Sequence, residues 1–530
     1  MEKEEKTNRK DMLFTILFVI IALHPIIELD YKIYEFFNNI GIPRLITIVD
    51  YVILPVLVVL IFWFYEKSKK KVLIVGVVYA LVFGVYFFFH CQNSAVIRDS
   101  IYLTDNFIFS IKNELMYTFV LLLPLVFIYI FYISDIKEKV LKQIIVLSSS
   151  LISWSIFISD VFIFGKSTYV GYTYDNIFSW FSLPFDRMYF HPRRYACKFF
   201  FEEGNTIGIL LLICLPLLYY FFFKEKNIKT KIYIGILILV QSLSMIILST
   251  RIATYGTILV PAAMLAVYII LCLLKQEKFT KIFLMFTACM TLVCGLILPY
   301  SPAYQNQQLD ALDYGRIKAD DDQKAEAMLL LKDADKLVKW TPEWRNFYEY
   351  MFEDYMFLIN LTPPIYFTDW YSYKYDPEFW VDVIFDYPLE ERVNGRQIET
   401  IFTKYKWNEL NTSQKLTGFG YSTFMNGGIL IERDFVQQYY SYGLIGVILV
   451  FVGWIFSLIF AVIKVLIGYK NGRWNLLNIT LLISIGLGFV SSLVSGHTFD
   501  ELTTSLFMSL CLGLLIKMLT TAKEKKSKII

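Results

Sequence analysis

Long apolar segments recur along this 530-residue chain and restrict its fold more than any other feature. A helix needs about 20 largely apolar residues to cross the hydrocarbon core of a membrane. Twelve segments meet this requirement, at residues 12–29, 45–65, 72–90, 114–134, 143–163, 206–223, 232–249, 252–274, 282–300, 437–466, 476–494 and 502–520. Hydrophobic residues make up 56% of the chain and charged residues 18%, too few to cover such segments in water. The sequence therefore predicts an all-α polytopic membrane protein with about 12 transmembrane helices.

Lysine and arginine are concentrated in alternate connections. The N-terminus, every second connection and the C-terminal tail together hold 26 of the 50 basic residues. Because basic loops resist translocation, both termini are predicted to be cytoplasmic in a multi-pass cell (plasma) membrane protein. The first apolar run follows a mixed-charge start and lacks an A-x-A site, so we interpret it as a retained span.

One very long connection, residues 301–436, lies on the other face. It carries 14 basic and 23 acidic residues, a net charge of 14 − 23 = −9. Apolar residues recur at 3- and 4-residue spacing in three stretches, Asp320 to Trp340, Pro342 to Leu358 and Leu389 to Leu410. This pattern predicts one large, mainly helical extracytoplasmic loop, interrupted at Pro363-Pro364 and Asp376-Pro377.

The chain is accordingly divided into three parts. Residues 1–300 contain transmembrane helices 1–9, residues 301–436 form the extracytoplasmic loop domain, and residues 437–530 contain helices 10–12 and a cytoplasmic tail.

Composition also excludes some function classes. The basic residues are segregated by topology rather than gathered for nucleic acid, and the seven cysteines show no metal or redox spacing. Cys91 and Cys197 fall in loops, and a bridge between them stays open. The spans are almost empty of charged groups, which argues against an ion-coupled transporter.

The turn between the seventh and eighth spans reads Ser249-Thr250-Arg251. Only a few residues join two apolar helices here, so Arg251 is expected at the outer membrane boundary. Its planar guanidinium suits phosphate oxygens. The alternative is an interfacial arginine that extends to lipid headgroups.

A second basic group, His191-Pro-Arg193-Arg194, precedes Glu202-Glu203-Gly204-Asn205 and the sixth span. Taken alone, this group could be a solvated loop. Two arginine groups on one face, beside an apolar environment, fit an anionic lipid headgroup better than a soluble metabolite.

The end of the long loop reads Thr417-Gly418-Phe-Gly420-Tyr421, followed by Glu432-Arg433-Asp434. The glycines permit a tight backbone turn. Partial desolvation at a membrane surface can raise a carboxylate pKa toward the value that a general base needs. An ordinary charged helix cap is the competing interpretation.

All four histidines are predicted on the outer face: His24, His90, His191 and His497. We expect His24 to be a packed, hydrogen-bonded residue rather than a catalyst.

Taken in order, these motifs resemble the O-antigen ligase and O-antigen polymerase superfamily of bacterial polytopic envelope glycosyltransferases. The matching features are Gly204-Asn205 before a span with Leu215-Pro216, the Ser249-Thr250-Arg251 turn, one large outer loop between late spans, Gly418-x-Gly420, and Gly443-Leu-Ile-Gly446. The likeness covers nearly the whole chain, although each motif is short.

The resemblance implies a GT-C-like, metal-independent, inverting glycosyltransferase that uses no cofactor. It would move a glycan from an undecaprenyl-diphosphate carrier to the hydroxyl of a glycan or cell-wall polymer, at the bacterial plasma membrane. Arg251, with Arg193, Arg194 and Arg433, would bind the diphosphate. The family often places a candidate base histidine in the large loop, and this loop has none. Glu432, Asp434 or His497 would have to serve instead.

Two other functions stay open. A flippase of lipid-linked oligosaccharides would also need cationic residues on the outer face. A non-enzymatic scaffold of an envelope assembly would need neither the arginines nor a catalytic base. The sequence leaves polymerase and ligase unseparated, and it identifies neither the sugar nor the acceptor.

Overall fold

The structure is a computed structural model. It describes residues 2–33, 39, 41–65, 69–134, 136–169, 171–182, 193, 195–308, 321–334, 336–356, 371–388, 395–468 and 473–527. These residues are overwhelmingly helical, and within them extended backbone pairs only at one isolated bridge, between Lys166 and Tyr172.

Twelve helical segments are long and apolar enough to cross a membrane, which confirms the twelve predicted spans. They are formed by α1 (Glu2–Ile27), α3 (Leu45–Ile48) with a π-helical turn (Val49–Ile53) and α4 (Leu54–Tyr65), α5 (Lys69–Ser100), α6 (Ile111–Ile133), α7 (Glu138–Val161), α10 (Gly204–Lys224), α11 (Ile228–Leu248), α12 (Arg251–Leu273), α13 (Lys281–Ile297), α22 (Asp434–Ile467), α23 (Leu476–Val494) and α24 (Leu502–Ser527). The chain is therefore a multi-pass membrane protein.

Helix α5 is longer than the segment 72–90 that its apolar run predicts. It has 32 residues, which at about 1.5 Å per residue span roughly 48 Å. A hydrocarbon core of about 30 Å cannot hold that length. Part of α5 therefore extends beyond the membrane.

Packing divides the chain into two compact units. Unit 1 comprises residues 1–79, 118–307 and 450–530, and unit 2 comprises residues 80–117 and 308–449. The boundaries predicted at residues 300 and 436 divide the chain by sequence position alone. Unit 2 is defined by packing, and it combines the long connection with parts of α5, α6 and α22.

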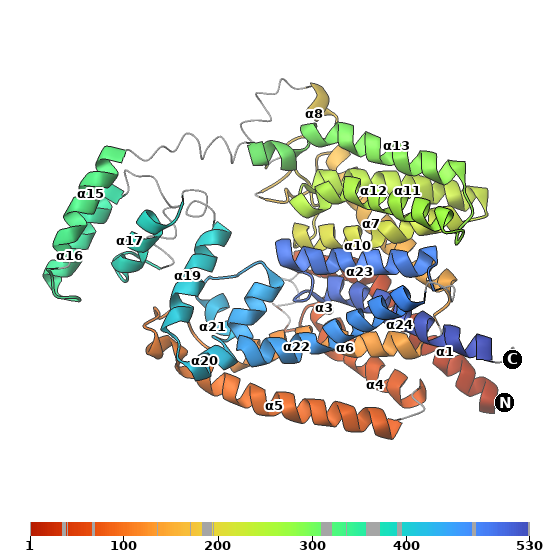
Figure 1. The fold of residues 1–530 in the computed structure, drawn as a ribbon, viewed down its shortest axis with the longest axis horizontal. Helices are drawn as coiled ribbons and strands as arrows, with labels where there is room; N and C mark the ends of the chain where they lie inside the picture. Colours follow the sequence, from red (N-terminus) through yellow and green to blue (C-terminus); the bar gives the residue numbers. More distant parts are fainter. Residues whose placement is uncertain are drawn as a thin grey trace. The chain divides into compact units, whose positions relative to one another are not determined.

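Helix α10 is the centre of unit 1. It packs against α7, α11, α12, α23 and α24, and nearly all of its side chains are buried. Most of these helices lie side by side with similar axes, and the two chain ends lie at the same end of the unit (Figure 1). An even number of spans is consistent with this placement of the termini.

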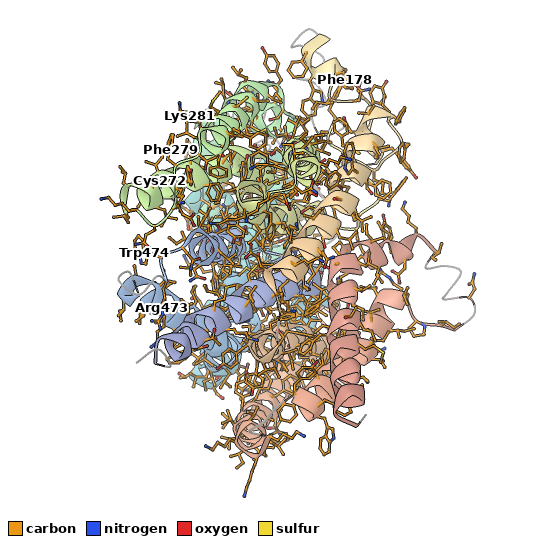
Figure 2. All side chains as sticks on the ribbon, turned by 90° about the vertical axis from the view of Figure 1, so that its right-hand side faces the viewer. Phe178, Cys272, Phe279, Lys281, Arg473 and Trp474 are labelled. Atoms are coloured by element: carbon orange, nitrogen blue, oxygen red, sulfur yellow. The ribbon has the colours of Figure 1, made fainter. Side chains whose placement is uncertain are left out.

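Aromatic and basic side chains mark the connections at the end of unit 1 that carries the termini. Phe279 and Lys281 lie at the start of α13, and Arg473 and Trp474 precede α23 (Figure 2). The indole of Trp474 donates a hydrogen bond to the carbonyl of Val465 over 2.9 Å. Such residues are typical of the membrane–water boundary.

Unit 2 is also helical. Its described helices beyond the spans are α15 (Asp321–Ala334), α16 (Pro342–Met351), a π-helical turn (Phe352–Met356), α17 (Pro377–Asp386), α19 (Gly395–Glu409), α20 (Thr412–Thr417) and α21 (Tyr421–Asn426). Helices α15, α16 and α19 confirm the three helical stretches predicted there. Aromatic side chains dominate the core that these helices share, including the fully buried Trp380, Tyr371 and Phe402.

Helix α17 was not predicted, although its start carries a clear signal. The Asp376 carboxylate accepts a hydrogen bond from the backbone N–H of Phe379 over 3.2 Å, and Pro377 occupies the first helical position. Both features are favoured at helix N-termini. The predicted break at Asp376-Pro377 is therefore a helix start, and Pro363-Pro364 lies outside the described residues.

All seven cysteines are free thiols, so Cys91 and Cys197 form no bridge. Cys197 is buried, with its sulfur 3.3 Å from the Ser159 hydroxyl.

Candidate active site

The turn that carries Arg251 joins two helices of unit 1 with only two residues. Helix α11 ends at Leu248, Ser249 adopts a left-handed conformation (φ +62°), Thr250 precedes α12, and Arg251 is the first residue of that helix. Ser249 and Thr250 are buried, whereas Arg251 is exposed. The chain thus presents the guanidinium at the helix end while the small hydroxyl residues make the turn.

Four successive residues of the loop after α7, Lys166 to Tyr169, link the segments around this turn; we name them the 166–169 strap. The Thr168 hydroxyl donates to the carbonyl of Leu248 over 2.6 Å, and the Tyr169 hydroxyl donates to that of Ser249 over 2.7 Å. Carbonyls in the last turn of a helix have no intrahelical partner. The strap satisfies two of these groups and fixes the turn.

Arg193 belongs to the same neighbourhood. Its carbonyl accepts a hydrogen bond from the Ser167 hydroxyl of the strap over 2.6 Å, and its Nε donates to Asn306 over 3.0 Å. Tyr255, one turn beyond Arg251 on α12, donates to Gln307 over 2.7 Å. These contacts link the segment of Arg193 to the turn before Arg251 and, through residues 306 and 307, to α12, the helix that Arg251 begins. Arg194 lies outside the described residues, as does His191.

The strap also contacts the start of α10. The backbone N–H of Lys166 donates to the carbonyl of Phe199, and that of Lys198 donates to the carbonyl of Lys166, over 2.6 and 2.9 Å. A Cβ at Gly204, the first residue of α10, would lie 2.6 Å from the Thr168 side chain. Glycine at the Gly204-Asn205 motif therefore lets the strap pass over the helix end.

A group of charged side chains at this end of unit 1 was missed by the sequence analysis. Arg44 donates from Nε to Asp30 over 3.0 Å and from Nη2 to Glu202 over 3.1 Å. The Lys198 ammonium donates to the carbonyl of Glu202 over 2.7 Å. Burial lowers the pKa of Lys198, and Glu203 opposes this effect. The position of Arg44 in a connection on the predicted outer face was the only available signal.

His497 lies in the connection between α23 and α24, also in unit 1. It is almost fully buried, its backbone is left-handed (φ +59°), and its Nδ1 lies 3.8 Å from an Asp500 oxygen. The neighbouring Glu501 is close to Glu28 and Asp500, and burial together with these carboxylates raises its pKa well above the ordinary range. Two adjacent acids directly before the last span were the signal for this group.

His24 is a packed, hydrogen-bonded residue, as predicted. Its side chain is 1% exposed, with Nε2 2.8 Å from the Asp50 carboxylate and Nδ1 2.8 Å from the Thr503 hydroxyl. Asp50 lies in a π-helical turn, an irregularity often found where a helix redirects a functional or structural side chain. This network joins the first, second and last spans.

The other predicted residues belong to unit 2. Glu432 forms an ion pair with Arg396, Arg433 is exposed, and Asp434 is fully buried as the first residue of α22. A carboxylate at that position is favoured by the helix dipole. Burial and the Glu432 carboxylate together raise the pKa of the nearby Glu399 to about 8, against the opposing effect of Arg396.

The glycine turn before these residues is confirmed. Gly418 and Gly420 have φ values of +86° and +87°, and Gly443 interrupts α22 with a φ of +66°. The backbones meet, because a Cβ on Gly443 would lie 2.6 Å from the Gly418 nitrogen. The Gly418-x-Gly420 and Gly443 motifs are thus the two sides of one backbone crossing.

A fully buried pair holds this turn. His90 on α5 bonds through Nδ1 to the carbonyl of Thr417 over 2.7 Å and through Nε2 to Glu114 on α6 over 2.9 Å. Glu114 accepts hydrogen bonds from the backbone N–H groups of Tyr421 and Ser422. The pair therefore fixes the end of α20 and the start of α21.

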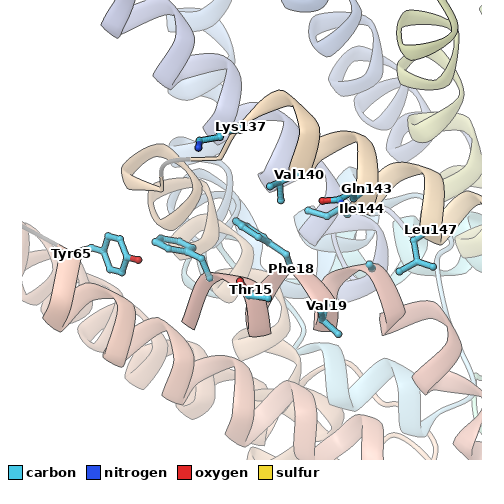
Figure 3. A pocket seen from close by; sticks show the side chains of 11 residues that line it. Thr15, Phe18, Val19, Tyr65, Lys137, Val140, Gln143, Ile144 and Leu147 are labelled. Atoms are coloured by element: carbon cyan, nitrogen blue, oxygen red, sulfur yellow. The ribbon is translucent and has the colours of Figure 1, made fainter. Parts of the chain in front are cut away.

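A cavity of about 480 Å³ lies at the opposite end of unit 1 from Arg251. Phe18 and Val19 of α1 face Ile144 and Leu147 of α7 across it (Figure 3). Lys137 lines one side. Its apolar walls suit a lipid chain, and its position separates it from the arginines.

These features define a multi-pass membrane protein with arginines fixed at one end of a helical bundle. The chain matches the family described as O-antigen ligase-like membrane proteins over residues 10–522, and it belongs to this family. The resemblance inferred from the sequence motifs is thereby confirmed. Neither the curated proteins nor the solved structures gave a match. Among the described residues, no three His, Cys, Asp or Glu side chains are grouped to hold a metal ion.

Proposed function

We propose that this protein is an inverting glycosyltransferase, a polysaccharide polymerase or ligase, that moves a glycan from an undecaprenyl-diphosphate carrier to an acceptor hydroxyl. Membership of the O-antigen ligase-like family supports a glycan-transferring membrane enzyme. The reaction takes place on the outer face of the bacterial plasma membrane, at the end of unit 1 opposite the cytoplasmic termini.

One observation carries this proposal: the 166–169 strap contacts both the backbone of Arg193 and Ser249 in the turn directly before Arg251. A diphosphate leaving group accumulates negative charge as its bond to the sugar breaks, and fixed cations stabilise that charge. Two guanidinium groups can each offer paired donors to phosphate oxygens. Arg194 and Arg433 also belong to the set of arginines proposed from the sequence; Arg194 lies outside the described residues, and Arg433 belongs to unit 2.

The chemical step needs one base. The base removes the proton from the acceptor hydroxyl, the oxygen forms a bond to the anomeric carbon from the side opposite the diphosphate, and the carbon–oxygen bond to the diphosphate breaks with its electron pair. His497 is favoured because it shares unit 1 with Arg251 and its Nδ1 lies 3.8 Å from an Asp500 oxygen. Glu432 and Asp434 are the alternatives; both belong to unit 2, and Glu432 is ion-paired with Arg396.

Replacing Arg251 tests the proposal. Arg251→Ala should reduce glycan transfer by at least about 100-fold, because removing a group that stabilises transition-state charge costs roughly 2.7–4 kcal/mol in comparable sites. Arg251→Lys should restore part of the activity, since it keeps the charge but loses the planar fork. Glycan chain length in cells and transfer to acceptor in membranes are the measurements.

Lys281→Ala is the matched control. Lys281 is also an exposed basic residue that begins a helix of unit 1, but it lies at the other end of the bundle. This variant should behave like the wild type. Normal glycan chains from Arg251→Ala, at normal protein levels, would refute the proposed enzyme.

A further inference from the structure

Unit 2 contains a groove that takes no part in the proposed transfer reaction. It encloses about 300 Å³ between α17 and α19, at the small end of the roughly 300–1,000 Å³ range of ligand sites. Phe379 and Val383 of α17 and Ile401 of α19 form its buried floor. The half-buried rings of Tyr387 and Tyr405 line its sides.

The rim of the groove is polar on both sides. Asp382 and Asp386 stand one turn apart on α17, and Lys404 and Asn408 stand one turn apart on α19. All four side chains are exposed, and none has a hydrogen bond or ion pair to the protein within the part of the chain that is described. Carboxylates accept hydrogen bonds, the ammonium donates them, and the amide does both.

This combination selects a ligand class. Aromatic rings below and mixed donors and acceptors above match a sugar ring, which has an apolar face and a hydroxyl-bearing edge. A helical peptide would need a longer apolar groove, and an extended peptide would need a free sheet edge. A ring with several hydroxyl groups satisfies both the floor and the rim.

The charge of the groove narrows the choice. Two rim carboxylates face one lysine. Burial raises the pKa of Asp382, and the carboxylates of Asp386, Glu378 and Asp376 add to this effect. Anionic sugars such as uronates would be repelled by this surface. The groove therefore suits neutral or amino-bearing sugars.

We propose that the α17–α19 groove binds a neutral or amino-bearing sugar unit of the glycan chain that the enzyme elongates or transfers. The proposal rests on the proposed function for its glycan, whereas the groove itself lies in unit 2. Tyr405 and Asn408 supply a ring face and an amide for the sugar, and Asp382 and Asp386 set the preference for its charge.

The experiment uses the full-length protein in detergent. The probe is the surface glycan of the source cells, cut to short oligosaccharides and separated by ion exchange into neutral, cationic and anionic fractions. Wild-type protein should bind a neutral or cationic fraction and not the anionic one. Tyr405→Ala and Asn408→Ala should each weaken this binding at least about 10-fold, as loss of about 1.4 kcal/mol implies.

A change in the preference for sugar charge gives a second readout. The double variant Asp382→Asn and Asp386→Asn keeps the shape of the rim but removes its charge, so it should gain affinity for the anionic fraction. Asp333→Asn, an exposed carboxylate on α15 outside the groove, is the control and should change nothing. Elution from a sizing column reports whether each variant is folded.

Arg251→Ala separates this inference from the proposed function. It should reduce transfer by at least about 100-fold but bind the glycan fraction as the wild type does. Loss of binding in the groove variants, together with normal transfer by Arg251→Ala, would support the groove as a sugar-binding site and refute the proposed transferase function. Two results would overturn the proposal that the groove binds sugar. One is wild-type protein that binds no fraction, and the other is folded Tyr405→Ala and Asn408→Ala variants that bind like the wild type.

Discussion

Ser249 lies in the two-residue turn between α11 and α12, Arg251 directly follows this turn, and the two residues have different roles. Ser249 is buried in a left-handed conformation, which a residue other than glycine adopts only at some cost. Arg251 is exposed at the first position of α12. Strain of this kind is retained where the surrounding structure determines the geometry, and here the 166–169 strap supplies the determining contacts.

Glu399 gives a residue-level prediction about pH. Because burial and Glu432 raise its pKa to about 8, the folded protein holds a proton that the unfolded chain releases between its ordinary pKa and about 8. The free energy of unfolding should therefore fall as pH rises through this window. Glu399→Gln should remove this dependence and raise the melting temperature at pH 9 relative to the wild type.

The size of the effect can be bounded. A change of about 1 kcal/mol moves Tm by roughly 2–4 °C in a domain of about 150–250 residues, so a shift of at least that size is expected. Thermal unfolding in detergent at pH 5 and pH 9 measures it. Glu326→Gln, an exposed carboxylate on α15, should leave both values unchanged. Parallel pH dependence in Glu399→Gln and wild type would contradict the prediction.

At the scale of elements, α22 is two helical pieces joined at Gly443. The interruption lets the turn at Gly418 and Gly420 cross the helix backbone, with Phe419 and Gly420 donating to the carbonyls of Tyr440 and Ser441 over 2.9 Å. Interrupted helices at membrane depth occur where protein replaces the missing backbone partners. The crossing supplies those partners.

Gly443→Ala should therefore be strongly destabilising. An added Cβ would face both a positive φ and the Gly418 nitrogen at 2.6 Å, and the neighbour is backbone that cannot rotate away. A melting temperature lower by at least several degrees, with faster proteolysis of unit 2, is expected. Gly84→Ala on α5 is the control, since a Cβ there meets nothing within 4 Å. It should be neutral or slightly stabilising.

Elements were predictable where a local pattern determines them. The twelve spans, the α15, α16 and α19 helices and the glycine turn all follow from periodicity, apolar length or backbone freedom. Helix α17 was missed because its apolar pattern is short, although Asp376-Pro377 marks its start. Each signal of this kind is contained in consecutive residues.

The pairing of distant residues could not be predicted in the same way. His90 and Glu114 contact a turn more than 300 residues away in the chain, and Arg44 contacts Glu202 across 158 residues. Arg193 was identified only as a member of one of two basic groups on a face, and its link to the turn before Arg251 depends on the intervening strap. Such contacts arise from tertiary packing, and no spacing of residues in the sequence predicts them.

For the whole molecule, the proposed orientation can be measured. In a chain whose native cysteines are replaced, Asp333→Cys on α15 should react with a membrane-impermeant thiol reagent in intact cells, because residues 301–436 are predicted outside. Lys281→Cys should react only after the membrane is opened. Both sites are exposed in the structure, so access depends on sidedness. The reverse pattern would place the termini outside.

The 166–169 strap has a consequence for how this chain can vary. Its four residues contact three segments in strict succession, at residues 198–199, 193 and 248–249, so inserting or deleting a single residue would misplace all of these contacts at once. Exchange of one side chain would disturb only one. Surface loops usually accept changes of length readily. In this loop, a change of length should therefore be tolerated less well than any single substitution within it.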